Sequence, residues 1–149
     1  MVADVKLPEI KFKPIGVIHS EIKERGAGHL LATATIEIDS ALAEGLDNLT
    51  DFSHIIVIFY FHKSRVPGPT KVTPRHHGLD TPIGVFASRS PDRPNAIGKT
   101  TVRLLKREEN ILTVEGMDAI DGTPVLDIKP YVPGIDCAEN AKAPSWMPY

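Results

Sequence analysis

Short apolar segments alternate with polar and turn-forming residues along most of the chain, and this pattern predicts β-strands rather than helices. Polar and apolar side chains alternate at residues 35–38 and 101–104, as they do in a strand with one buried face. Residues 55–61 are all apolar, which favours a central strand covered on both faces. We expect strands at residues 12–19, 32–38, 55–62, 84–87, 100–105, 111–117 and 125–128.

Helix signals are few, whereas turn and loop signals are frequent. Ser40 can cap one short helix over residues 41–46, and residues 108–110 predict a tight antiparallel hairpin. Prolines and glycines interrupt residues 63–82, which predicts a long surface excursion without regular pairing, and the prolines of residues 88–98 predict a second loop. The sequence therefore predicts an all-β fold, a small antiparallel barrel or a sandwich, with one short helix and long loops.

The composition indicates one globular domain over residues 1–149, because apolar residues make up 42% and charged residues 24% of the chain. Cys137 is the single cysteine, so no intrachain disulfide can form and a cytoplasmic location is expected. The apolar run at residues 55–61 is far shorter than the roughly 20 residues needed to span a bilayer, so we expect no membrane segment.

The net charge of −2 and the pI near 6.3 provide no general attraction to nucleic acid, so any contact with RNA must be local. Basic side chains do gather in two stretches, and they are either RNA contacts or ordinary solvated surface charges. The first stretch holds Lys63, Arg65, Lys71, Arg75, His76 and His77, and the second holds Arg89, Arg93, Lys99 and Arg103.

Residues 87–98 are the segment best suited to hold a ligand. Two prolines stiffen this loop, so that Arg89, Arg93 and Asn95 can be held in place at low entropic cost on binding. The alternative interpretation is a stiff surface turn whose arginines pair with Asp92 or with nearby carboxylates.

Two further segments carry candidate ligand-binding side chains. Asp118 and Asp121 lie in a turn segment that ends at Gly122, which lets a ligand approach the backbone, although Asp-Gly is also a common hairpin signal. His62 and Lys63 end the apolar run, where the mouth of a barrel would lie. The histidine and cysteine spacings match no zinc or iron pattern, so we expect no metal.

Four segments taken together resemble the TrmO family of tRNA methyltransferases, also called the TsaA-like or YaeB-like domain. They read KPIGVIHS at residues 13–20, DFSHI at 51–55, GVFASRSPDRPN at 84–95 and DAIDGTPVLDIKPY at 118–131. Each segment alone is a weak signal, and their common order within residues 10–136 is what identifies the family.

The resemblance implies a β-barrel, S-adenosylmethionine as the methyl donor, and a homodimer whose subunits both shape the site. The implied acceptor is the exocyclic nitrogen of threonylcarbamoyladenosine, next to the anticodon of tRNA. By position, the resemblance implies donor contacts from His62, Lys63, Arg89, Ser90, Pro94, Asn95, Asp121, Gly122, Thr123 and Pro124.

Loss of a proton would make the acceptor nitrogen a better nucleophile, and Asp118, Asp121 and His62 are the candidate bases. Candidate phosphate contacts on the RNA are Arg93 and the Arg75-His76-His77 cluster.

The chain departs from the family pattern at two places. Residues 26–30 replace a Pro-Arg-Gln segment that many relatives carry near the cofactor, and Ala96 stands where proline is usual. Two alternative functions stay open on the sequence. One is a non-catalytic RNA-binding barrel, and the other is a methyltransferase that acts on a small molecule or on another RNA.

Overall fold

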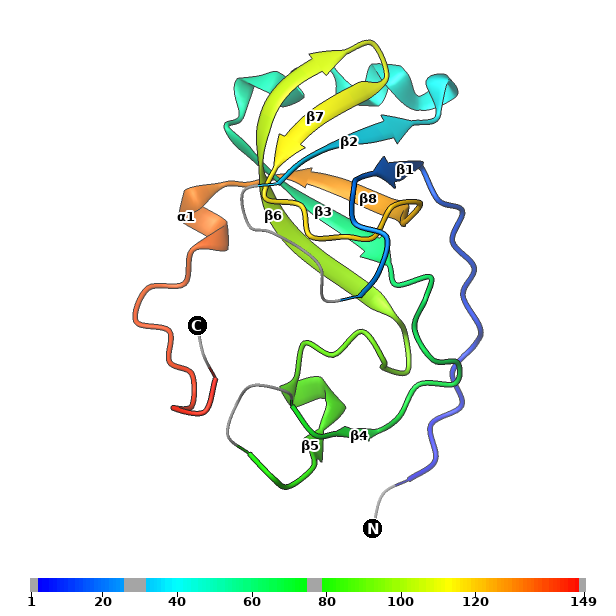
Figure 1. The fold of residues 1–149 in the computed structure, drawn as a ribbon, viewed down its shortest axis with the longest axis vertical. Coiled ribbons are helices and arrows are strands. Elements are labelled where there is room, and N and C mark those ends of the chain that lie inside the picture. The colour runs from blue at the N-terminus through cyan, green and yellow to red at the C-terminus, as the bar shows by residue number, and fades with distance from the viewer. Residues whose placement is uncertain (1–2, 26–31, 75–78, 148–149) are drawn as a thin grey trace.

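The computed structural model of the protein describes residues 3–25, 32–74 and 79–147. Six strands form a closed antiparallel barrel, hydrogen-bonded in the order β1-β2-β7-β6-β3-β8 (Figure 1). The predicted all-β barrel is therefore confirmed. The barrel strands are β1 (Gly16–His19), β2 (Thr33–Ile38), β3 (His54–Tyr60), β6 (Ile97–Glu108), β7 (Ile111–Glu115) and β8 (Pro124–Pro130).

β3 is the most buried strand, and it lies between β6 and β8. Ile55, Val57 and Phe59 point into the barrel and are at most 4% exposed. On the outer face, Ile56 is buried, whereas Tyr60 is 37% exposed. The prediction of a strand covered on both faces therefore holds for most of β3 but fails at its end.

The predicted hairpin is present, since β6 and β7 pair antiparallel across residues 109 and 110. The predicted helix is a 3-10 helix, η1 (Ser40–Leu46), and its N-cap is Asp39 rather than Ser40. The Asp39 carboxylate accepts a hydrogen bond of 3.0 Å from the backbone N–H of Ala41, which satisfies one of the free donors of the first turn. Two short helices complete this part of the fold, η2 (Leu49–Asp51) and α1 (Pro133–Asp136).

The segment between β3 and β6 forms a small lobe at one end of the barrel (Figure 1). Two predictions are wrong here. β4 (Lys71–Val72) pairs with β5 (Ile83–Gly84), although residues 63–82 were expected to lack regular pairing. The strand expected at residues 84–87 is instead the helix η3 (Val85–Ala87), in which Val85 is buried and Phe86 is 81% exposed.

The strand directions bring the functional candidates to one end of the barrel. β1 and β3 end where β8 begins, because Val17 pairs with Pro124 and Phe59 pairs with Val125. β6 begins at the same end, since Tyr60 is the partner of Ile97. The loops that follow β1 and β3 and precede β6 and β8 therefore leave the barrel together.

Candidate functional site

The loop after β3 and the loop before β8 meet through His62. The half-buried imidazole places Nδ1 3.5 Å from the Thr123 hydroxyl, and a Cβ added at Gly122 would lie 3.9 Å from its Nε2. Gly122 has φ +85°, a conformation that L side chains rarely adopt, so the turn depends on glycine. Three of the predicted donor contacts are therefore neighbours in space.

The turn at residues 120–123 is fixed to the barrel by its own backbone. The N–H of Gly122 donates to the carbonyl of Ile18 at 2.8 Å, and the N–H of Ile18 donates to the carbonyl of Thr123 at 2.9 Å. Thr123 is buried, and its hydroxyl donates to the carbonyl of Ile120. A turn held in this way presents its backbone in one conformation.

Asp121 binds the segment that follows β1. One carboxylate oxygen accepts from the backbone N–H of Ser20 at 3.0 Å, and the other lies 2.8 Å from the ammonium of Lys23. The Lys23 hydrogen bond and then the Ser20 N–H lower the pKa of Asp121, because both stabilise the charged carboxylate. A carboxylate with a lowered pKa is a weak base, so this environment disfavours Asp121 as the base among the three candidates.

The loop before β6 is braced internally by Arg93. Its guanidinium donates to the carbonyls of Ser88 and Ser90 at 3.0 and 3.2 Å. The N–H of Phe61, next to His62, donates to the carbonyl of Ala96 at 2.7 Å. The loop is therefore rigid and joined to the end of β3, and the role of Arg93 as a phosphate contact stays a prediction.

Asp92, in the same loop, is a functional candidate that sequence reasoning missed. It is 8% exposed, and its carboxylate accepts from the backbone N–H of Arg65 at 2.8 Å. The guanidiniums of Arg25 and Arg65 lie at 3.3 to 3.4 Å from the same carboxylate. The Arg65 N–H contributes most to lowering the pKa of Asp92, although burial opposes the shift. The alternative interpretation, in which the loop's own arginines pair with Asp92, is therefore wrong about the partners. Asp92 pairs with Arg25 and Arg65 from two other segments, and Arg93 donates to backbone carbonyls instead.

A groove of about 930 Å³ lies beside these loops. It brings Pro94 and Asn95 together with Pro124, three predicted donor contacts from two loops. The remaining walls come from the ends of β3 and β6, from Arg65 to Gly68 and from the extended N-terminal segment at residues 7–14. Its volume falls in the range of small-molecule sites, roughly 300 to 1,000 Å³, and its lining is mostly apolar with few polar groups, as such sites are.

Other predicted site residues are not brought into these contacts. Arg89 and Asp118 are exposed, and no hydrogen bond or ion pair within the described ranges involves either side chain. Lys63 is exposed and donates to the carbonyl of Lys23 at 3.4 Å, while Ser90 accepts from the N–H of Asp92 at 3.3 Å. Three of the predicted RNA contacts, Arg75, His76 and His77, lie outside the described residues.

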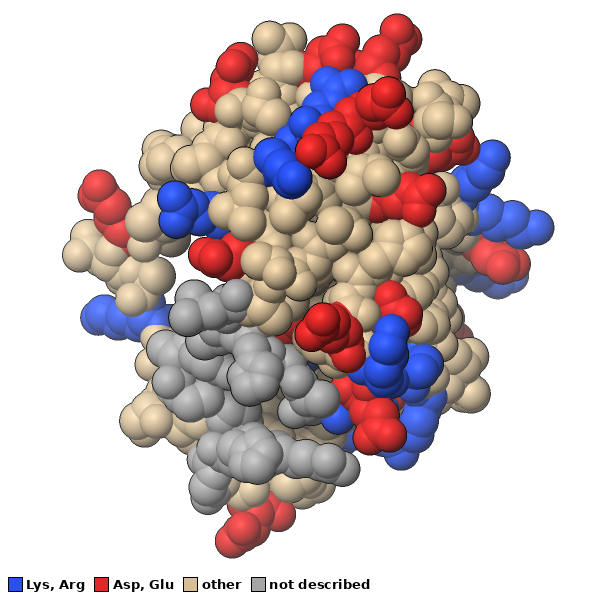
Figure 2. All heavy atoms as spheres, turned by 45° about the horizontal axis from the view of Figure 1, so that its top comes forward, with Lys and Arg blue, Asp and Glu red and all other residues tan. Residues whose placement is uncertain are grey.

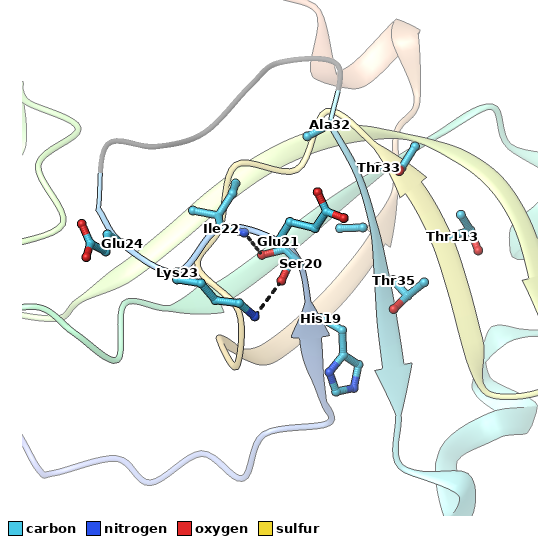
Figure 3. A pocket seen from close by; sticks show the side chains of 11 residues that line it. His19, Ser20, Glu21, Ile22, Lys23, Glu24, Ala32, Thr33, Thr35 and Thr113 are labelled. Atoms are coloured by element: carbon cyan, nitrogen blue, oxygen red, sulfur yellow. Dashed lines mark hydrogen bonds between the residues drawn. The ribbon is translucent and has the colours of Figure 1, made fainter.

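A second cavity, of about 950 Å³, flanks the segment after β1 (Figure 3). Residues 19–24 form one wall, and the start of β2 with Thr113 forms the other. Figure 3 shows the side chain of Lys23 bent back toward the carbonyl of Ser20, at 3.3 Å. This cavity contains none of the predicted donor contacts, so the groove beside Asn95 and Pro124 is the better candidate.

Charges of both signs are mixed over the face shown in Figure 2, without a broad basic surface. This mixture agrees with the net charge of −2. Among residues 3–25, 32–74 and 79–147, no group of three acidic, histidine or cysteine side chains is placed to hold a metal ion. In the same ranges, no helix has the length and hydropathy needed to cross a membrane.

Solved structures place this barrel in a known class. The chain aligns with the crystal structure of TrmO from Pseudomonas aeruginosa with a TM-score of 0.74 and 35% identity, over 93% of this chain and 62% of that one. Residues 19–137 match the family described as the tRNA-methyltransferase O N-terminal domain. The chain therefore belongs to this family, and the family predicted from the four motifs is confirmed.

Two curated relatives that match the chain are longer than it is. The chain is 45% identical over 144 residues to a probable S-adenosyl-L-methionine-binding protein of Pyrococcus abyssi. This alignment covers 93% of the chain and 76% of the Pyrococcus protein. The chain is 46% identical over 101 residues to the tRNA (adenine(37)-N6)-methyltransferase of Homo sapiens, over 66% of this chain. That match spans only 22% of the human protein.

Proposed function

We propose that the chain binds S-adenosylmethionine and transfers its methyl group to the exocyclic nitrogen of threonylcarbamoyladenosine in the anticodon loop of tRNA. The observation that carries the proposal is the convergence of three predicted donor loops at one end of the barrel, together with membership of the tRNA-methyltransferase O family. The names of the relatives in Pyrococcus abyssi and Homo sapiens support the donor and the adenine acceptor respectively.

The groove offers what a nucleoside-containing donor needs. Pro94, Pro124 and Tyr60 provide apolar surface for a flat base, and Asn95 provides an amide for hydrogen bonding. At the adjoining turn, Gly122 carries no side chain that would block a ligand from the backbone near His62. S-adenosylmethionine supplies a methyl group on a sulfonium, and the loops supply alignment of that group with the acceptor nitrogen.

For removal of the acceptor proton, His62 and Asp118 are the stronger candidates. The ion pair with Lys23 lowers the pKa of Asp121 and makes it a weak base, which supports a role for Asp121 in holding the segment after β1. His62 lies half-buried against Thr123, whereas Asp118 is exposed near the start of the same loop.

Contact with tRNA is proposed to be local. Bases of an anticodon loop can be splayed out and read on their edges, so no duplex has to be opened. Local contacts with the loop then suffice, and a broad basic surface is not needed. The proposed phosphate contacts are Arg93 and the cluster of Arg75, His76 and His77. A tRNA substrate is consistent with the cytoplasmic location that we propose.

We also propose that the chain forms a homodimer through the apolar side chains around the groove. Val66 from the lobe, and Leu7, Ile10 and Phe12 from the N-terminal segment, line the groove and are each between 69% and 80% exposed. So many large apolar side chains on one monomer surface are typical of an interaction site. Sedimentation equilibrium should give twice the monomer mass of 16.3 kDa, and a monomer at micromolar concentration would refute the proposal.

The central test uses the purified chain with S-adenosylmethionine and tRNA that carries threonylcarbamoyladenosine. We expect mass spectrometry of the digested nucleosides to show one added methyl group on that nucleoside. A tRNA lacking the threonylcarbamoyl group is the matched control and should gain none. Binding of RNA without any methyl transfer would favour a non-catalytic barrel, and methylation of the control RNA would favour another acceptor.

A further inference from the structure

Asp92 is a buried charge, and its carboxylate is fully engaged by other loops. One oxygen accepts from the backbone N–H of Arg65 at 2.8 Å and lies 3.4 Å from a guanidinium nitrogen of Arg25. The other lies 3.3 Å from both guanidiniums. A buried carboxylate without such partners would be strongly destabilising, so the two arginines and the loop are held in one arrangement.

Each partner of Asp92 belongs to a different segment at this end of the barrel. Arg65 follows His62 by three positions, and Asp92 precedes Pro94 by two. Arg25 ends the segment whose Ser20 and Lys23 bind Asp121. The Asp92 carboxylate thus connects three segments of the chain. Arg65 precedes Asp92 by 27 residues, and Arg25 precedes it by 67.

Backbone packing strengthens the same connection. A Cβ added at Gly68 would lie 2.1 Å from the carbonyl oxygen of Arg93, so the loop after β3 rests directly on the loop that carries Asp92. The segment after β1 accepts two further hydrogen bonds from the neighbouring loops. Lys63 donates to the carbonyl of Lys23, and the N–H of Asp121 donates to the carbonyl of Ile22 at 2.7 Å.

We propose that Asp92 is a positioning residue that fastens two of the donor-binding loops, those after β3 and before β6, to each other and to the segment after β1, so that the site is preformed, without touching the donor itself. This inference rests on the proposed function, because the loops matter only if they hold S-adenosylmethionine. Loss of Asp92 should leave the loops free to separate, so that part of the binding energy is used to order them again.

The test compares Asp92→Asn with Asp47→Asn. Asp47 is the matched control, because it also pairs with an arginine, Arg107 at 2.8 Å, but at the hairpin end of β6. For Asp92→Asn we expect the dissociation constant and the KM for S-adenosylmethionine to rise about 10- to 100-fold, with kcat at saturating donor within about threefold of wild type. For Asp47→Asn we expect both donor constants to match wild type.

A second variant keeps the test decisive if Asp92→Asn does not fold. Arg25→Ala leaves the Arg65 contacts in place, because Arg25 is 46% exposed and contributes only one of the two guanidiniums. It should raise the dissociation constant about three- to tenfold.

Hydrogen exchange provides a second readout for Asp92→Asn. Exchange should become faster at the amide of Arg65, since that amide loses its charged acceptor.

The outcomes separate the two proposals. If wild type binds S-adenosylmethionine and Asp92→Asn and Arg25→Ala bind it equally well, the role of Asp92 is refuted while the proposed function stands. An equal loss of affinity in Asp47→Asn also refutes the role of Asp92. If wild type itself does not bind the donor, the proposed function and this inference fail together.

Discussion

Replacement of Gly68 by alanine tests how tightly the loop after β3 packs on the loop before β6. The added Cβ would lie 2.1, 2.3 and 2.7 Å from three backbone atoms of Arg93, whereas ordinary contacts begin at 3.4 Å. Backbone atoms cannot rotate away as a side chain does, so one loop must move by about an ångström. Overpacking of this kind costs roughly 1 to 3 kcal/mol.

The movement should also reach the proposed donor site, since Arg93 directly precedes Pro94 and Asn95. We expect Gly68→Ala to lower the melting temperature by roughly 2 to 12 °C, because 1 kcal/mol corresponds to about 2 to 4 °C in a chain of this size. The dissociation constant for S-adenosylmethionine, measured by calorimetry, should rise about tenfold or more, which corresponds to about 1.4 kcal/mol.

Gly84→Ala is the matched control, because Gly84 lies in the same lobe and a Cβ there meets nothing within 4 Å. Its φ of −59° suits alanine, so the control should melt at or slightly above the wild-type temperature and bind the donor normally. If Gly68→Ala behaves like Gly84→Ala in both assays, the close packing of the two loops is refuted.

Three further predictions concern other parts of the same end of the barrel. Gly98→Ala should lower the free energy of unfolding by about 1 to 3 kcal/mol in urea, because its Cβ would lie 2.6 to 2.7 Å from the rings of Phe59 and Phe61; unchanged stability would contradict this packing. Arg89→Ala should weaken donor binding, and an unchanged calorimetric affinity would remove Arg89 from the site. Asp92 should stabilise the fold above pH 4 and lose this effect as the pH falls through its lowered pKa, since an unfolded aspartate has a pKa of about 3.9. The difference in unfolding free energy between wild type and Asp92→Asn should therefore shrink toward pH 2.5, and a difference that grows there would show that the sign is wrong.

Local patterns were sufficient to predict most of the barrel. Alternation and apolar runs located β2, β3 and β7 to within a few residues, because one or both faces of these strands are buried. The prediction of a strand at residues 84–87 was wrong because a run of three apolar residues does not distinguish strand periodicity from helix periodicity. These residues form a helical turn from which Phe86 points outward. β6 begins at Ile97, earlier than expected, since Gly98 makes room for aromatic rings rather than ending the strand.

The candidate site shows a different limit. Its loops could be chosen from sequence by their prolines, glycines and charges, and the family resemblance assigned their roles. The ion-pair partners of the charged side chains could not be predicted from the sequence. Asp92 is next to Arg93 in sequence but pairs with Arg25 and Arg65. Lys23 was missed for the same reason, as its ion pair with Asp121 spans 98 residues. Contacts of this kind depend on barrel closure, which no local signal records.

The most direct measurement of the central claim is a crystal structure of the chain with S-adenosylhomocysteine, the product of methyl transfer. We expect the ligand at the end of the barrel where β3 stops and β8 begins, in contact with His62, Asn95 and the turn at Gly122. A ligand bound in the cavity lined by Thr33 and Thr113, or one that touches none of the three loops, would contradict it.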